Sequence, residues 1–380
     1  MRIALIEPAF HFEVVDTYIK MFKHHVDAID IYTSQEVKQM IQLHDDSSKI
    51  RFYLKGEESF DLFIVSIGIN AEAYDIVIIT TNESLDHSNL YHKKLDGAYL
   101  LVHNVNLTLN PYDLKHLFLY PTRIPILLLK ILKSFLNSVE KTRTKTFQNY
   151  SKILFPSEDI VKYSYIKYGN YLKNKKVISG ELYGMERFEK IKKISNQIKI
   201  VVPGTIDHSA RNYKNLSVFL CSEFFNDVEI VFLGKIKNLS MISNLVQKGS
   251  KVEFVYQKNG FTSEEYEYHL SQADLAILPL KRHVFQSTTY EIQGKTLMSG
   301  SINDVSRFSI PFFYYEKISI PEAFKKVSIS YKNGKHLNDL LQDAILNKSY
   351  LDLRNNYESL FDEQNYITKG QKLLNKLLSN

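Results

Sequence analysis

The sequence predicts an α/β protein of two doubly wound, Rossmann-like domains, and three observations support this prediction. Short runs rich in β-branched residues alternate with longer segments of helical period, which is the pattern of βαβ units and parallel sheets. Most of these runs are continuously apolar, as in strands that are covered on both faces. The chain has 380 residues, which is long for one domain and typical of two.

Two series of predicted strands define the domains. The first series comprises residues 2–7, 28–32, 50–54, 75–81, 98–104, 152–157 and 176–182. The second comprises residues 198–204, 228–234, 251–256, 275–280 and 310–315. The charged segment 183–196 is predicted to link the two series, and the tail is helical in pattern. We therefore expect domains over residues 1–185 and 186–347, followed by a helical segment over residues 348–380.

The composition excludes several classes of protein. Hydrophobic residues make up 44% and charged residues 24%, which is the balance of a globular chain rather than a disordered one. No run approaches the roughly 18 apolar residues of a membrane span. The start MRIALIEPAF is expected to form a strand rather than a signal peptide. The single cysteine, Cys221, excludes an intramolecular disulfide and a cysteine metal cluster, so that a cytoplasmic location is expected.

The net charge of +6 is mildly basic. It falls short of the concentrated basic face that nucleic-acid binding requires, so no nucleic-acid partner is expected. The charge suits an acidic substrate or the anionic inner leaflet of a membrane.

The loops that follow the strands are the places to look for a site, because ligands of doubly wound sheets bind at the carboxyl ends of the strands. In the second series, Gly204 ends the first strand, and Arg211 and Lys214 stand at the start of the next helical pattern. Cations at a helix N-terminus are unfavourable unless an anion lies nearby. The pair therefore predicts an anion, and the alternative is a solvated basic pair at the surface.

The stretch STTYEIQGKTLMSGSIND is the second candidate for an anion site. It offers hydroxyl groups, the charge of Lys295, and a small-residue turn before a helix, where free N–H groups and the helix dipole favour an anion. Ser301 and Asp304 have the spacing of a weak capping box. The alternative is a polar segment that simply starts a helix. The residues expected at a diphosphate are Ser287, Thr288, Thr289, Lys295, Ser299, Gly300 and Ser301.

Three further places carry candidate residues. Backbone groups near Tyr256 and the ring of Phe261 are candidates for holding a flat base, and the alternative is a capped helix with a packed aromatic ring. In the first series, His11 and Glu13 follow the first strand, and His103 ends the fifth. His11 or Glu13 is a candidate general base on a hydroxyl group. The alternative for each is a structural polar group at a strand end.

Residues 114–145 combine a dense apolar cluster with several lysines and arginines. An apolar face edged by basic residues is typical of a protein that lies on an anionic membrane without spanning it. The alternative is a buried helix with a basic exposed edge.

Taken together, these features resemble the GT-B fold glycosyltransferases. Two Rossmann-like domains and a C-terminal helix long enough to cross back carry the resemblance at the level of the fold. The stretches IVVPGTIDHSARNYKNL, VEIVFLG, FTSEEYEYHLSQADLAILP and GKTLMSGSINDVSRFSIPFF look like the donor-binding half of bacterial sugar transferases. The resemblance implies two domains facing a central cleft, with the acceptor bound by the first domain and the nucleotide-sugar by the second.

The resemblance also implies roles for residues. Gly204, Thr205, Arg211 and Lys214 would lie near the donor diphosphate, Asp304 near the ribose, and His11 and His103 beside the acceptor and the transferred sugar. No cofactor and no metal would be needed, because the helix dipole and cations can stabilise the leaving diphosphate. The implied activity is transfer of a sugar to a saccharide or lipid-linked saccharide in cell-surface polymer synthesis.

One departure from the family concerns the mechanism. Many retaining members carry two glutamates eight positions apart, whereas here Glu291 is followed eight positions later by Ser299. Retaining and inverting chemistry both stay open. So do two other functions, a non-catalytic partner subunit of a transferase and a sugar-nucleotide epimerase or hydrolase on the same fold.

Overall fold

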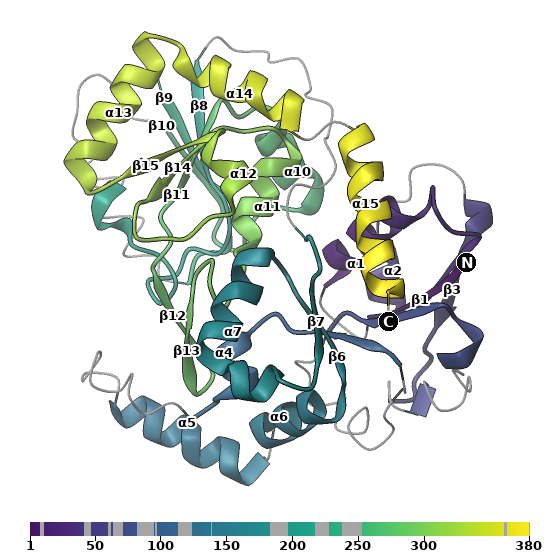
Figure 1. The fold of residues 1–380 in the computed structure, drawn as a ribbon. Coiled ribbons are helices and arrows are strands. Elements are labelled where there is room, and N and C mark those ends of the chain that lie inside the picture. The colour runs from purple at the N-terminus through teal and green to yellow at the C-terminus, as the bar shows by residue number, and fades with distance from the viewer. Residues whose placement is uncertain are drawn as a thin grey trace. The chain divides into compact units, whose positions relative to one another are not determined.

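The computed structural model describes the chain except residues 8–10, 42–46, 60–61, 64–70, 82–94, 96, 113–123, 138, 183–196, 217–227, 238–252, 361–362 and 380. The chain forms two units (Figure 1). Unit 1 comprises Met1–Leu182, Phe285–Met298 and Glu363–Asn380, and unit 2 comprises Tyr183–Val284 and Ser299–Asp362. The predicted linker, residues 183–196, lies outside the described residues.

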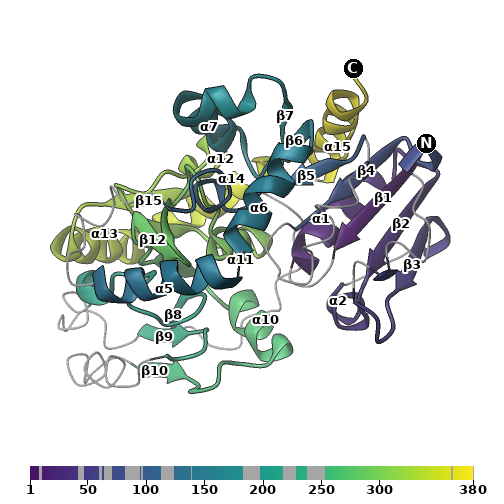
Figure 2. The same ribbon diagram turned by 90° about the horizontal axis from the view of Figure 1, so that it is seen from below.

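Unit 1 is built on a seven-stranded sheet of order β3-β2-β1-β4-β5-β6-β7, part of which is seen in Figure 2. All its strand pairs are parallel. The order reverses beside β1, which is the switch point where doubly wound sheets bind ligands. The strands are β1 (Arg2–Glu7), β2 (Ala28–Thr33), β3 (Ile50–Leu54), β4 (Ile76–Ile79), β5 (Tyr99–Leu101), β6 (Lys152–Phe155) and β7 (Lys176–Ser179).

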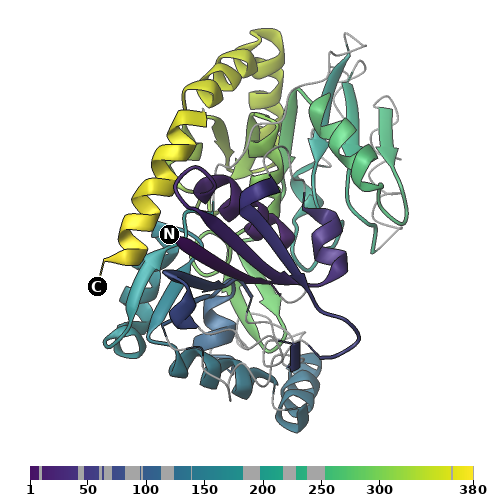
Figure 3. The ribbon, with the colours of Figure 1, turned by 90° about the vertical axis from the view of Figure 1, so that its right-hand side faces the viewer.

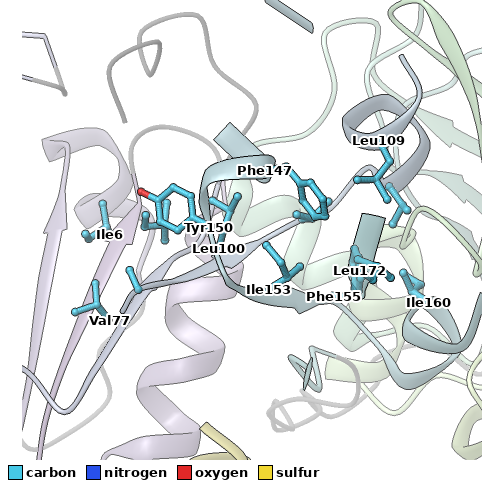
Figure 4. Packing of buried hydrophobic residues seen from close by; sticks show 14 of the residues in the cluster. Ile6, Val77, Leu100, Leu109, Phe147, Tyr150, Ile153, Phe155, Ile160 and Leu172 are labelled. Carbon is cyan, nitrogen blue, oxygen red and sulfur yellow. The ribbon is translucent and has the colours of Figure 1, made fainter. Parts of the chain in front are cut away.

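Helices cover this sheet, and the apolar strand residues form a core with them. Figure 4 shows part of this core, in which Leu100 and Ile153 of neighbouring strands lie near Phe147 and Tyr150. The helices of unit 1 are α1 (Phe12–Phe22), α2 (Gln35–Met40), α4 (Val105–Leu109), α5 (Ile124–Asn137), α6 (Val139–Asn149), α7 (Glu158–Leu172) and α15 (Glu363–Leu378), with short 3-10 turns at Ser47–Lys49 and Ala71–Ala73.

Helix α15 returns from the end of the chain to unit 1 (Figure 3). The hydroxyl of Tyr99 donates to the carbonyl oxygen of Leu377 at 2.5 Å. Gly370 lies so close to the backbone of α1 that a side chain there would collide with the carbonyl group of Met21. The predicted return of a C-terminal helix to the first domain is thus confirmed for α15. The preceding helix, α14 (Ser349–Leu360), belongs to unit 2.

Unit 2 is built on a six-stranded sheet of order β10-β9-β8-β11-β14-β15, again with parallel pairs. The strands are β8 (Ile198–Val202), β9 (Val228–Phe232), β10 (Glu253–Tyr256), β11 (Leu275–Leu278), β14 (Phe312–Tyr315) and β15 (Ser328–Tyr331). Its other described elements are α14, a 3-10 turn at Tyr213–Asn215 and the helices α10 (Ser263–Ser271), α11 (Gly300–Arg307), α12 (Glu322–Lys325) and α13 (Gly334–Leu346). The predicted α/β class with two parallel sheets is confirmed.

Between β11 and α11 the chain forms a two-stranded sheet of β12 (His283–Gln286) and β13 (Thr289–Ile292). Residues Phe285–Met298, which we call the inserted hairpin, belong to unit 1 although the chain before and after them belongs to unit 2. In Figure 1, β13 lies beside α4. Several residues predicted near a diphosphate therefore stand in unit 1.

Candidate functional site

Unit 2 holds a buried arginine at the carboxyl end of its sheet. Arg211 is 7% exposed, and its Nε donates to the carbonyl oxygen of Thr205 at 2.9 Å. Its Nη2 donates to Oγ of Ser301 at 2.8 Å. Its Nη1 has no hydrogen-bond partner among the residues described. Arg211 is therefore a buried cation with a donor left for a further acceptor, and not a solvated surface charge.

The first turn of α11 lies next to this guanidinium group. Its N-cap is Ser299, which makes no side-chain cap bond, while the hydroxyl of Ser301 donates to the carbonyl oxygen of Pro203 at 3.2 Å. The predicted capping box starting at Ser301 is therefore wrong. Apart from the chain neighbours and the backbone of α11 itself, no atom of the described residues lies within 4 Å of where a side chain would begin at Gly300. Open space, free N–H groups at a helix start and a neighbouring cation together favour an anion.

Gly204 makes room for this arrangement. It follows β8 with φ +84°, a conformation that side chains disfavour. A Cβ atom there would collide with the guanidinium group of Arg211 and with Oγ of Ser301. A glycine is needed here because the guanidinium group of Arg211 approaches the backbone.

Near Arg211, Tyr266 of α10 forms a hydrogen bond with Asp304 of α11. Its hydroxyl donates to Oδ2 of Asp304 at 2.8 Å. Burial, and then the charge of Asp304, raise the pKa of Tyr266 well above its ordinary value, so the phenol stays protonated and holds the carboxylate. We call Gly204, Arg211, Tyr266, Ser301 and Asp304 the arginine cluster.

Unit 1 holds a pair of histidines at the carboxyl ends of β1 and β5. The rings of His11 and His103 are stacked, with centroids 3.9 Å apart and planes at 19°. His103 Nε2 lies 2.8 Å from the carbonyl oxygen of Thr80, and His11 Nδ1 lies 3.1 Å from Oε1 of Glu13. The three residues that the sequence singled out in the first domain are thus brought together.

The partners of these rings assign their hydrogens. A carbonyl oxygen and a carboxylate only accept, so hydrogen lies on Nε2 of His103 and on Nδ1 of His11. Nε2 of His11 is then the basic nitrogen when that ring is neutral. Burial acts to raise the pKa of Glu13, but the hydrogen bond and charge of His11 hold that pKa below its ordinary value. Glu13 is therefore a carboxylate at neutral pH.

Two further residues, linked to His103 by hydrogen bonds, were missed by the sequence analysis. Glu7, at the end of β1, is fully buried, and the hydroxyl of Thr80 donates to its Oε2 at 2.5 Å. Thr80 also receives the hydrogen bond from His103 and so links that ring to the carboxylate. The acid directly after the apolar run RIALI was the available signal for Glu7. We call Glu7, His11, Glu13, Thr80 and His103 the histidine cluster.

The remaining predicted residues take other places. Ser287 lies in the hairpin turn with φ +46°, Thr289 is buried in β13, and the hydroxyl of Thr288 donates to the carbonyl oxygen of Pro111 at 2.5 Å. Nζ of Lys295 lies 5.7 Å from the ring centroid of Tyr163. All these contacts are made within unit 1. Of the residues predicted at a diphosphate, those in contact around the guanidinium group are Gly204, Thr205, Arg211 and Ser301.

Lys214 and Tyr256 are exposed side chains of unit 2, in the 3-10 turn and at the end of β10. Thr262 starts α10 with a full capping box, while Phe261 packs edge-on against His269 at 4.8 Å between ring centroids. The described residues include no cluster of three or more His, Cys, Asp or Glu side chains arranged to hold a metal ion.

Comparison with known proteins finds similarity in structure alone. No family model and no curated protein matches the sequence. Anabaena Alr3699/HepE, solved with UDP, is 11% identical with a TM-score of 0.57, covering 99% of this chain and 100% of that one. The catalytic domain of starch synthase IV from Arabidopsis thaliana, solved with ADP and acarbose, is 11% identical with a TM-score of 0.57 and full coverage of both chains.

A third similar structure has a different activity. UDP-GlcNAc 2-epimerase from Neisseria meningitidis, solved with UDP-GlcNAc, is 13% identical with a TM-score of 0.53 and full coverage of both chains. These likenesses confirm the predicted fold: the chain has the GT-B glycosyltransferase fold.

Proposed function

We propose that the chain is a glycosyltransferase that moves a sugar from a nucleotide-sugar donor to a hydroxyl group of a saccharide or lipid-linked saccharide, in the synthesis of a cell-surface polymer. The observation that carries this proposal is the arginine cluster. Its buried guanidinium group, whose Nη1 has no hydrogen-bond partner among the described residues, lies beside the start of α11 on a GT-B fold. A nucleoside diphosphate is the ligand that this charge arrangement suits best.

The arginine cluster would bind the donor and stabilise its departure. When the bond between the anomeric carbon and the phosphate oxygen breaks, the nucleoside diphosphate keeps the electron pair and gains negative charge. Arg211 and the N–H groups at the start of α11 would stabilise this charge without a metal ion. Asp304, fixed by Tyr266, would accept from a ribose hydroxyl. The proposal includes hexosyltransferase-like activity.

The histidine cluster would act on the acceptor. The hydroxyl oxygen of the acceptor attacks the anomeric carbon, and the hydroxyl proton passes to Nε2 of His11. Glu13 stabilises the imidazolium that forms. This is an inverting mechanism with a single displacement. The hydrogen bond between His11 Nδ1 and Glu13, at 3.1 Å, is the geometric support for assigning the base to that nitrogen.

Thermal stabilisation by nucleotides tests the donor proposal. The chain would be titrated with UDP, ADP, GDP, CMP and TDP, and one of them is expected to raise the melting temperature. Stabilisation by none would contradict the enzyme proposal and favour a non-catalytic partner subunit. Release of nucleoside diphosphate from the matching sugar nucleotide is then measured with and without saccharide acceptors. Turnover that needs no acceptor would indicate the epimerase or hydrolase instead.

The exposed face of α5 supports a second part of the proposal, contact with the anionic inner face of the cytoplasmic membrane. Leu128, Leu129 and Leu132 are 49%, 68% and 61% exposed, and Lys133 beside them is exposed as well. Residues 124–149 carry five basic side chains and one acidic side chain. The part of the predicted segment at 114–123 lies outside the described residues. None of the helices described is long and apolar enough to span a bilayer.

Vesicle sedimentation tests this contact. The chain is expected to bind vesicles that contain phosphatidylglycerol, to bind phosphatidylcholine vesicles weakly, and to lose binding when Leu128, Leu129 and Leu132 are replaced by serine. Replacement of the exposed Leu346 of α13 by serine is the matched control. Equal binding by the triple variant would contradict the assignment. A change of oligomeric state in that variant, with no vesicle binding by either form, would indicate a second copy of the chain as the occupant.

A further inference from the structure

We infer that Glu291 is a positioning residue for His103, and that the inserted hairpin Phe285–Met298 acts through it on the histidine cluster. The inference rests on the proposed role of His103 beside the acceptor. It concerns contacts within unit 1, where the hairpin meets helix α4, the five-residue helix that begins two residues after His103.

The carboxylate of Glu291 holds the first turn of α4. The side chain is fully buried; Oε1 accepts from the backbone N–H of Leu107 at 2.7 Å and Oε2 from that of Asn106 at 3.2 Å. The N-cap residue, Asn104, makes no side-chain cap bond. Glu291 thus supplies, from 184 positions along the chain, the acceptors that a helix start needs.

Two more hydrogen bonds from the hairpin complete this support. The backbone N–H of Val105 donates to the carbonyl oxygen of Thr296 at 3.0 Å, and Nδ2 of Asn106 donates to that of Tyr290 at 2.6 Å. Three consecutive backbone N–H groups, at positions 105, 106 and 107, are therefore satisfied by the hairpin. On its other side Asn106 is held by α7, since its Oδ1 accepts from the hydroxyl of Tyr168 at 2.7 Å.

The hairpin contacts are close to His103 along the chain, because Val105, the first residue that they hold, lies two positions after it. The ring of His103 is fixed by Thr80 and stacked on His11, and its backbone leads directly into the segment that the hairpin holds. Loss of the carboxylate would leave buried N–H groups without acceptors, and α4 would move to satisfy them. A displacement of this kind alters the stacking of the two imidazole rings and so the orientation of His11.

Glu291 is not placed to contact a sugar itself. It is 0% exposed, and both of its carboxylate oxygens already accept backbone hydrogen bonds. Glu291 stands eight residues before Ser299, so the second glutamate of the paired pattern of retaining transferases is missing here.

Histidine NMR tests the positioning directly, without any assumption about activity. In Glu291→Gln, one acceptor of the pair becomes an NH₂ donor, and we expect the imidazole signals of His11 and His103 to shift while those of His208 and His336 in unit 2 stay in place. Amide exchange at positions 105–107 should be about 10-fold faster, as for loss of a charge-assisted bond. Unchanged imidazole signals would overturn the proposal, whatever the stability of the variant.

Asp30→Asn is the matched control. Asp30 is also a fully buried carboxylate of unit 1, bonded to Arg51 Nε at 2.7 Å and to the hydroxyl of Tyr74 at 2.8 Å, away from α4. The Asp30→Asn variant should have a lower melting temperature than the parent chain, with the imidazole signals of His11 and His103 unshifted. In turnover assays we expect Glu291→Gln to lower kcat about 10-fold with the nucleotide Kd unchanged. Shifted signals with no turnover in the parent chain would refute the transferase and leave the positioning role standing.

Discussion

The arginine cluster of unit 2 and the histidine cluster of unit 1 both lie where parallel strands end, yet their polar groups are satisfied in opposite ways. Arg211 has a buried donor without a partner among the described residues, beside a helix start that also offers donors, so that cluster has hydrogen-bond donors in excess. His11 and His103 have their donors matched to Glu13 and Thr80, so that cluster offers a basic nitrogen. The first arrangement is suited to holding an anion, and the second to moving a proton. Variants that affect anion binding without proton transfer, or the reverse, test this difference between the clusters.

Replacement of His11 by glutamine should have the largest effect. Loss of a general base lowers kcat by about 10²–10⁴-fold, and the nucleotide Kd should stay the same because no donor contact is removed. Steady-state kinetics and calorimetry with the same preparation measure both quantities. An equal loss of nucleotide affinity would show that the two clusters do not divide the work as proposed.

Arg211→Ala should weaken nucleotide binding by about 100-fold, which corresponds to the loss of charge-assisted hydrogen bonds worth about 2–3 kcal/mol.

Lys295→Ala is the sharpest comparison with Arg211→Ala, because the sequence predicts both cations at a diphosphate. Nζ of Lys295 lies over the ring of Tyr163, so we expect its removal to change the Kd less than threefold. If Lys295→Ala weakened nucleotide binding more than Arg211→Ala does, the diphosphate would have to be assigned to the inserted hairpin instead of the arginine cluster.

Tyr266→Phe tests whether Asp304 must be held in place. The variant removes one buried hydroxyl and leaves the ring, at a cost of about 1 kcal/mol of stability. If Asp304 contacts the ribose, nucleotide affinity should fall about fivefold, since a freed carboxylate is less well oriented. A Kd equal to that of the parent chain would restrict Asp304 to a structural role.

The smallest effect is expected from acid. The pKa of Glu13 is lower in the folded chain than in the unfolded one, so its contribution to stability is complete above the ordinary glutamate pKa. This contribution is lost as the pH falls through the lowered value. The melting temperature of the parent chain should therefore exceed that of Glu13→Gln near pH 6, and the difference should vanish in acid. A difference that stayed constant as the pH falls below the ordinary glutamate pKa would contradict the pairing with His11.

The sequence was most informative where a physical rule acts locally. Continuously apolar runs predicted the strands, and polar residues that follow them, such as His11, His103 and Arg211, could be expected at a common edge because parallel strands end together. The strand SISY at 328–331 was missed because it is short and half polar.

The inserted hairpin shows where such rules stop. A polar stretch with serines, threonines and a lysine has the same composition whether it binds a ligand or supports a helix elsewhere in the fold. Glu291 accepts a hydrogen bond from Leu107, which is 184 positions away, and no pattern near either residue predicts that contact. The contact between Glu7 and Thr80 was missed as well, although both residues stand at the ends of neighbouring parallel strands.

Unit 1 is assembled from three separate stretches of chain, the last of which is α15. During synthesis, therefore, unit 1 is incomplete until the residues from Glu363 onward have emerged from the ribosome. Until then the surface of α1 around Met21, shaped for the close approach of Gly370, is left uncovered, and apolar surface exposed in this way is prone to aggregation. A premature stop that removes α15 would thus destabilise the N-terminal half of the protein.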